Sequence, residues 1–191
     1  MDIKKTIQAS IDVKKKLMED EDFIRQMHEL VEEIKDCFSE DGKVFFCGNG
    51  GSAADAQHLA AEFSGRFYYD RDPLYSEALH VNTSYLTAVA NDYSFDEVYS
   101  RLVKAKGREG DILVGLSTSG NSSNIVKALE QANRQNMITV AFTGEPGGKM
   151  KEEADFLIKV PSGDTPRIQE GHIMIGHIIC EAVESQMFPK K

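Results

Sequence analysis

The sequence predicts an α/β fold in which a mostly parallel, five-stranded sheet lies between two layers of helices. Three observations favour this three-layer α/β/α class. Short apolar runs typical of buried strands recur along the chain, and segments with helical apolar spacing separate most of them. Glycine- or serine-rich turns follow two of the runs. Strands that alternate with helices form parallel sheets with right-handed crossovers, and ligands bind at the carboxyl ends of such strands.

Residues 2–39 have the apolar spacing of two helices. The acidic run at 19–22 favours a break, because carboxylates stabilise the N-terminus of a new helix. The apolar positions of the two stripes are Ile3, Ile7, Ile11, Val13 and Leu17, then Phe23, Met27, Leu30, Val31, Ile34 and Phe38. Two long helices are more than an α/β unit needs, so they either dock on another subunit or only cover the sheet. We therefore divide the chain into a helical extension, residues 1–40, and an α/β domain, residues 41–191.

The remaining elements follow from apolar spacing and turn residues. We expect the first strand at 44–47, then a glycine-rich turn and a helix that Ser52 can N-cap. The later elements are strands at 77–82, 111–116, 137–142 and 155–160, and helices at 84–90, 95–106, 125–134 and 169–186.

Composition excludes several classes of protein. The chain has 191 residues, 41% apolar and 28% charged, which suits one soluble domain with its own core. It has no apolar run of the ~20 residues that span a bilayer and no apolar signal at its start, so we expect a cytoplasmic protein. The three cysteines are isolated from one another and indicate reduced thiols. The net charge of −9 argues against nonspecific nucleic-acid binding but not against a small anion.

The turn at 48–52, G-N-G-G-S, follows the first strand. Its glycines allow a sharp bend that brings backbone N–H groups close to a ligand. The helix that starts there adds free N–H donors and partial positive charge, so the turn suits an anion, most simply phosphate.

A second turn, S-T-S-G-N-S at 117–122, also joins a strand to a helix. It carries four hydroxyls, on Ser117, Thr118, Ser119 and Ser122. It has neither the lysine of a P-loop nor the G-x-G-x-x-G of dinucleotide sites, which favours a phosphomonoester. The alternative is a well-capped helix, but a cap needs only one hydroxyl.

Three further groups are candidates for chemistry. His58 and Glu62 are an i, i+4 pair on one helix face, equally consistent with a solvated contact and with a general base or metal-ligand pair. Gln169 and His177 lie on an apolar terminal segment, where a histidine is either a core residue or a site residue. Asn91 and Asp92 interrupt an apolar helix and either cap the next helix or contact a substrate.

Taken together, these segments resemble the sugar isomerase (SIS) domain family, and within it the phosphoheptose isomerases, over nearly the whole chain. The resemblance rests on C-G-N-G-G-S-A-A-D-A-Q-H-L-A-A-E, A-N-D-Y-S-F, G-R-E-G-D-I-L-V-G-L-S-T-S-G-N-S, F-T-G-E-P-G-G-K-M and R-I-Q-E-G-H-I-M-I-G-H. It implies an aldose–ketose isomerase that converts sedoheptulose 7-phosphate to D-glycero-D-manno-heptose 7-phosphate through an enediol, for lipopolysaccharide or capsule precursors. It also implies a homotetramer with active sites at subunit interfaces.

The resemblance also implies roles for individual residues. Glu62 and His177 would be the acid/base pair, and zinc would be bound by His58, Glu62, Gln169 and His177. The substrate would contact Asn49, Gly50, Gly51, Ser52, Glu62, Asn91, Asp92, Ser117, Thr118, Ser119, Ser122 and Gln169. We expect the serine turn to bind the phosphate and the glycine turn to face the sugar.

Two points complicate this assignment. Some relatives have an aspartate where Pro166 stands, and Asp164 is nearby. Gln169 and His177 would lie roughly 12 Å apart along one straight helix, so either Gln169 precedes the helix or the two come from different subunits. Other members of the family bind sugar phosphates or a replication initiator without catalysis, or isomerise another ketose phosphate; the complete acid/base set favours an enzyme here.

Overall fold

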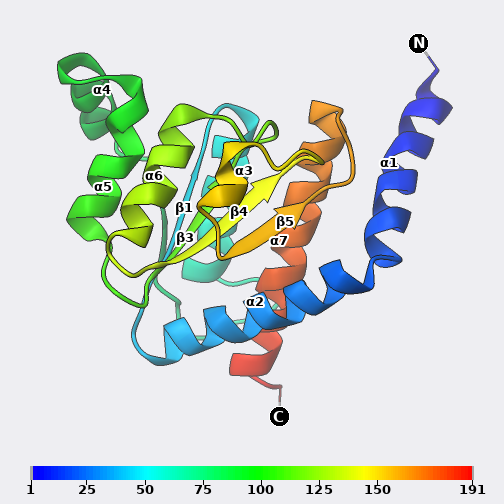
Figure 1. The fold of residues 1–191 in the computed structure, drawn as a ribbon. Coiled ribbons are helices and arrows are strands. Elements are labelled where there is room, and N and C mark those ends of the chain that lie inside the picture. Colours follow the sequence, from blue (N-terminus) through cyan, green and yellow to red (C-terminus); the bar gives the residue numbers. More distant parts are fainter. Residues whose placement is uncertain (1, 191) are drawn as a thin grey trace.

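The computed structural model describes residues 2–190 and has three layers, with a sheet between two sets of helices (Figure 1). The elements in chain order are α1 (Ile3–Met18), α2 (Glu21–Ser39), β1 (Val44–Gly48), α3 (Gly51–Ser64), β2 (Ser76–Ala78), α4 (Thr83–Asp92), η1 (Phe95–Glu97), α5 (Val98–Lys106), β3 (Ile112–Leu116), α6 (Ser123–Asn133), β4 (Ile138–Thr143), η2 (Lys149–Glu152), β5 (Phe156–Lys159) and α7 (Thr165–Met187).

The sheet confirms the predicted class. Its strand order is β2-β1-β3-β4-β5, and every neighbouring pair is parallel. From β1 the chain builds β2 on one side and then β3 to β5 on the other, so the direction of winding reverses between β1 and β3. Ligands of doubly wound sheets bind at such a switch point, outside the carboxyl ends of the strands.

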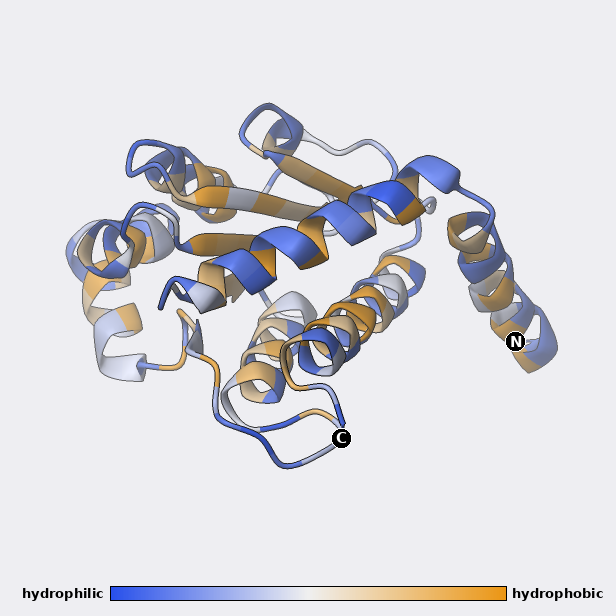
Figure 2. Cartoon of the chain, turned by 90° about the horizontal axis from the view of Figure 1, so that it is seen from below, coloured by the Kyte–Doolittle hydropathy of each residue, from blue (hydrophilic) through white to orange (hydrophobic). Residues whose placement is uncertain are grey.

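Successive strand residues point to opposite faces, and each face has its own core. On β1, Val44 and Phe46 belong to the core under α2, α3 and α7, whereas Phe45 and Cys47 belong to the core under α5 and α6. In Figure 2 the strands are mostly hydrophobic, while α2 carries both hydrophobic and hydrophilic residues along its length. Within residues 2–190, no helix combines the length and apolarity needed to cross a membrane.

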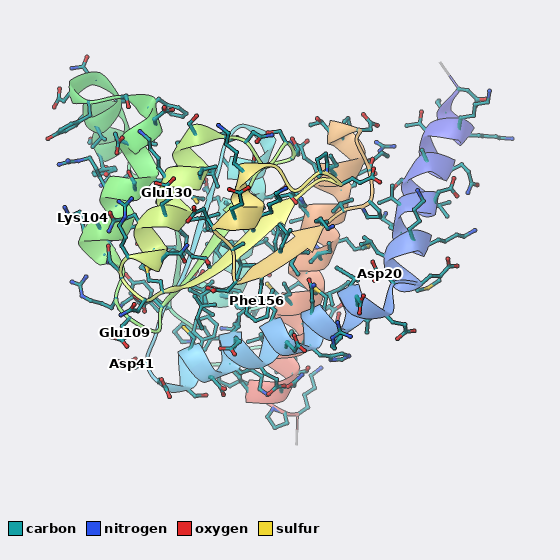
Figure 3. All side chains as sticks on the ribbon, in the orientation of Figure 1. Asp20, Asp41, Lys104, Glu109, Glu130 and Phe156 are labelled. Carbon is teal, nitrogen blue, oxygen red and sulfur yellow. The ribbon has the colours of Figure 1, made fainter. Side chains whose placement is uncertain are left out.

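The two N-terminal helices break where the acidic run predicts. Asp20 caps α2 by accepting a hydrogen bond from the Phe23 N–H at 3.0 Å, and it lies at the junction with α1 (Figure 3). Helix α1 stands at the edge of the molecule (Figure 1). Its predicted apolar stripe is only partly covered. Val13 and Leu17 are buried, whereas Ile3 is 65% exposed, Ile7 56% and Ile11 40%.

Several boundaries differ from prediction. Ser52 does not cap α3, because the helix already begins at Gly51 with Gly50 as its N-cap, and Ser52 is buried in the first turn. Strand β2 is shorter than the predicted 77–82. Helix α7 begins at Thr165, so Pro166 lies in its first turn, where the missing N–H costs no hydrogen bond. Gln169 therefore lies inside the helix, and the expectation that it might precede the helix is wrong.

Candidate functional site

The glycine turn and the serine turn, both predicted to contact the ligand, lie side by side at the switch point. Gly48 at the end of β1 pairs with Leu116 at the end of β3, so the glycine turn and the serine turn leave the sheet together. A reciprocal amide pair joins them: Asn49 Nδ2 donates to Asn124 Oδ1 at 2.9 Å, and Asn124 Nδ2 donates to Asn49 Oδ1 at 3.0 Å. The Tyr99 hydroxyl also donates to the Gly48 carbonyl at 2.5 Å. These contacts fix the glycine turn against the start of α6.

Three of the four hydroxyls of the serine turn converge. The Ser117 hydroxyl lies 2.9 Å from that of Ser122 and 3.4 Å from that of Ser119. Ser122 is the N-cap residue of α6, yet among the described residues its side chain makes no capping bond. Its hydroxyl pairs with Ser117 instead, so simple helix capping does not explain the serines. The converging hydroxyls at a helix N-terminus form an anion-binding geometry.

The glycine turn is shaped by a close contact with α7. Gly50 has φ of +56°, which an L side chain rarely adopts, and it accepts the first N–H bonds of α3 through its carbonyl. The Gln169 carboxamide packs directly on Gly51, where an added Cβ would stand 3.0 Å from Gln169 Cδ and overlap its nitrogen. The structure thus brings Gln169 to the glycine turn, as expected for a residue that contacts the substrate there.

Further along the same two helices, His177, His58 and Glu62 form a row. His58 Nε2 lies 3.0 Å from His177 Nε2 and 3.2 Å from Glu62 Oε1. The helices approach closely here because Gly176 packs on Leu59, leaving no room for a Cβ. The row opens to solvent, with the His58 side chain 49% exposed. The predicted acid/base pair and its histidine neighbour are therefore together in one chain.

The four predicted zinc ligands do not meet in one chain. Gln169 is beside Gly51, whereas His58 lies about 10 Å further along α3 at 1.5 Å per residue. In the part of the chain that the structure describes, no three His, Cys, Asp or Glu side chains converge as a metal site. His58 contacts both His177 and Glu62, whereas no hydrogen bond or ion pair within the described residues joins His177 directly to Glu62. Their imidazole and carboxylate groups are donors that zinc prefers, so the chemistry of the donors fits while the set within one chain is incomplete.

Asp55 is a site neighbour that the sequence did not single out. It lies on α3 close to His58 and His177. Burial raises the pKa of the Asp55 carboxyl, although the two histidines act in the opposite direction. Its Oδ2 atom is buried and has no hydrogen-bond partner within residues 2–190. An i, i+3 spacing before His58 was the only sequence signal for it.

A buried ion pair anchors the end of α3 that carries Glu62. The Arg71 guanidinium donates to the Glu62 carbonyl at 2.8 Å and to the Glu184 carboxylate at 3.2 Å. Glu184 also accepts from the backbone N–H groups of Phe67 and Tyr68 at 2.8 and 2.7 Å. Burial alone would raise the pKa of Glu184, but these donors outweigh it and leave the pKa below its ordinary value.

Asn91 and Asp92 occupy the exposed last turn of α4 rather than the cap of the next helix. There the Asn91 amide donates to the Asp92 carboxylate at 2.9 Å. No hydrogen bond within the described residues joins this pair to either turn or to the histidine row, so its role as a substrate contact stays a prediction.

Comparisons with known proteins agree with the site. The family model described as "SIS domain" matches residues 8–144. The chain is 51% identical over 189 residues to a phosphoheptose isomerase of Aneurinibacillus thermoaerophilus, covering 99% of this chain and 96% of the other. It is 49% identical to a phosphoheptose isomerase of Clostridium acetobutylicum, with the same two coverages of 99% and 96%. The solved structure of a phosphoheptose isomerase from Neisseria gonorrhoeae superposes with a TM-score of 0.89 at 42% identity, covering 96% of this chain and 97% of that one.

Proposed function

The chain belongs to the SIS-domain family, and we infer that it is an aldose–ketose isomerase that interconverts sedoheptulose 7-phosphate and D-glycero-D-manno-heptose 7-phosphate in heptose biosynthesis. One observation carries this inference: its similarity to phosphoheptose isomerases extends over 99% of the chain at about half identity. The site geometry agrees with it, because an anion-binding turn and a carboxylate–histidine row serve a phosphorylated sugar and a proton transfer.

The serine turn binds the phosphate. The hydroxyls of Ser117, Ser119 and Ser122 converge, and the N-terminus of α6 adds backbone N–H donors and partial positive charge. Holding the phosphate far from the reacting carbons orients the open-chain sugar and lowers the entropic part of the barrier. The glycine turn, with Gln169 packed on it, then contacts the sugar, and Asn91 with Asp92 contributes hydroxyl contacts.

The reaction moves a proton between C1 and C2 through an enediol. Glu62 acts as the base that removes this proton, and His177 exchanges protons with the sugar hydroxyls. His58 lies between them, 3.2 Å from the Glu62 carboxylate and 3.0 Å from the His177 ring. It keeps both groups oriented.

We further propose that His58, Glu62, Gln169 and His177 hold one zinc ion, which would polarise the sugar carbonyl. Because Gln169 of the same chain lies beside Gly51 and away from the row, the ligand set is proposed to be completed across a subunit interface. A homotetramer with shared active sites provides such an interface. The exposed isoleucines of α1 support it, since oligomers bury faces of this kind.

The proposed function is tested by turnover of sedoheptulose 7-phosphate, followed by NMR in deuterated water. We expect the wild type to form the aldose and to incorporate deuterium at the carbon next to the carbonyl. Glu62→Gln should lose at least about 10³-fold in kcat, because the amide cannot accept the proton. Glu109→Gln changes an exposed carboxylate away from the histidine row in the same way and serves as the control.

Two results would contradict the proposal. A wild type that does not isomerise the heptose phosphate refutes the assigned reaction. A Glu62→Gln variant that keeps the wild-type rate, with unchanged circular dichroism, refutes Glu62 as the base while leaving the reaction in place.

A further inference from the structure

We propose that the loop at 144–149, G-E-P-G-G-K, is a positioning element that holds the serine turn in its anion-binding shape. We call it the support loop. It connects β4 to η2, and the proposed mechanism assigns it no part. This inference rests on the proposed function, because it concerns the phosphate-binding turn of that reaction.

Three backbone N–H groups in and beside the support loop donate to the serine turn. Gly144 donates to the Thr118 carbonyl at 3.1 Å, and Met150, directly after the loop, donates to the Gly120 carbonyl at 3.0 Å. Lys149 donates to the side-chain oxygen of Asn121 at 3.1 Å. The acceptors span the middle of the turn, so its path is held at several points by one neighbouring segment.

The two segments also interlock where both have glycine. Gly120 has φ of +66° and Gly148 has φ of +58°, and their backbones are in direct contact. A Cβ on Gly148 would overlap the Gly120 carbonyl and lie 2.6 Å from the backbone carbonyl oxygen of Ser119. A Cβ on Gly120 would lie 2.6 Å from the Gly147 carbonyl carbon and 2.9 Å from the Gly148 nitrogen. Backbone cannot yield as a flexible side chain does, so a side chain at either position must move the turn.

A shift of the serine turn would displace the hydroxyls that converge on the anion. Ser119 sits at the contact with Gly148, and its hydroxyl is placed by Asn121, whose N–H donates to it at 3.1 Å. Asn121 also accepts a hydrogen bond from the support loop through its side chain. Moving this part of the turn would separate the Ser119 hydroxyl from that of Ser117, now 3.4 Å away, and spoil their convergence on one anion. The support loop thus acts on phosphate binding through Ser119, without touching the phosphate.

The experiment compares Gly148→Ala with Gly147→Ala. Both glycines belong to the support loop and both have positive φ, so both substitutions cost backbone strain. A Cβ on Gly147, however, would meet nothing closer than 3.4 Å, an ordinary contact with Lys151. Gly147→Ala therefore introduces strain without pushing on the serine turn.

We expect Gly148→Ala to raise KM for sedoheptulose 7-phosphate and the inhibition constant of inorganic phosphate by about tenfold or more, with kcat within about threefold of wild type. Gly147→Ala should leave both constants within about twofold and should lose less thermal stability than Gly148→Ala, because its Cβ overlaps no backbone. If Gly148→Ala does not fold, Asn121→Ala, which removes the exposed acceptor of the Lys149 N–H, should raise the phosphate inhibition constant at least about threefold.

The outcomes separate this inference from the proposed function. Suppose that the wild type isomerises the heptose phosphate. Equal changes of KM and of the phosphate inhibition constant in the two alanine variants, or a loss in Gly148→Ala that is confined to kcat, would then overturn the support-loop inference alone. A wild type that fails to isomerise this sugar overturns the proposed function. In that case phosphate binding, measured by calorimetry, still tests the loop: weaker binding in Gly148→Ala but not in Gly147→Ala supports it, and equal binding overturns it.

Discussion

His172 is buried on α7, the helix that also carries Gln169 and His177, and it should make the folded protein sensitive to mild acid. Its side chain is fully buried, and its Nε2 atom donates to the Thr143 carbonyl at 3.1 Å. Its Nδ1 atom is buried and has no partner within the described chain. Burial lowers the pKa of His172 from 6.5 to about 4, more than the bond to Thr143 raises it. The folded protein therefore holds this histidine neutral.

The size of the effect follows from proton linkage. Between the folded and unfolded pKa values the unfolded chain binds the proton and the folded chain does not, so the free energy of unfolding falls as pH decreases. For pKa values of 6.5 and about 4, the loss relative to neutral pH is about 2 kcal/mol at pH 5 and about 3 kcal/mol at pH 4. This contribution is complete above pH 6.5 and is lost on the way down to pH 4.

The measurement is urea unfolding of wild type and His172→Gln at several pH values between 4 and 8. Glutamine has an amide that can donate to the Thr143 carbonyl but does not titrate, so the variant should lose stability more shallowly in acid. His28→Gln, on the exposed surface of α2, is the control and should follow the wild-type curve. Parallel curves for wild type and His172→Gln between pH 7 and pH 4 would refute the assignment.

Three other predictions concern the metal, the interface and the α3 anchor. Chelator treatment should lower turnover and added zinc should restore it; indifference to both would remove zinc from the mechanism. Ile7→Glu should reduce the mass seen by light scattering, whereas Lys4→Glu on the same exposed helix should not; an unchanged mass would argue against an α1 interface. Glu184→Gln should cost about 3 kcal/mol in urea unfolding because the Arg71 guanidinium loses its buried partner, whereas Glu181→Gln should cost nearly nothing. Equal losses in the two glutamine variants would contradict the structural role of this pair.

Much of the fold could be read from local sequence. The strands that end in Gly48 and Leu116 are continuous apolar runs, and the i, i+4 spacing of His58 and Glu62 places them on one face of any helix. The glycine, serine and threonine residues of the two turns predicted both candidate ligand-binding turns for the same local reason. The short helix η2 was not predicted, and the segment 95–106 is η1 followed by α5 rather than one helix. The other errors lie at the ends of elements, as at Ser52, where Gly50 with its positive φ already serves as the N-cap.

What escaped prediction depends on residues far apart in the chain. Asn124 looks like an ordinary polar residue at a helix start until the fold brings it to Asn49. Gly148 has a reason to be glycine only because the backbone of Gly120 lies against it. The position of Gln169 depends on how α7 aligns with α3, which no spacing within α7 reveals. Contacts of this kind between distant residues are set by tertiary packing, and a single sequence carries no signal for them.

The separation between the turns and the histidine row bears on how the active site is assembled. Glu62 follows the glycine turn by three turns of α3, about 16 Å from Gly51 at 1.5 Å per residue. A groove between α1 and α7 opens beside His177. It is lined by apolar side chains, among them Phe67, Ile173 and Ile178, and by the charged side chains of Lys14, Glu170 and Glu181. The incomplete ligand row and the uncovered apolar surface thus lie on the same side of the chain. A subunit packed into this groove would cover the apolar surface and could bring its own glycine turn and Gln169 to the histidine row. The proposed shared site and the proposed tetramer should therefore fail or hold together.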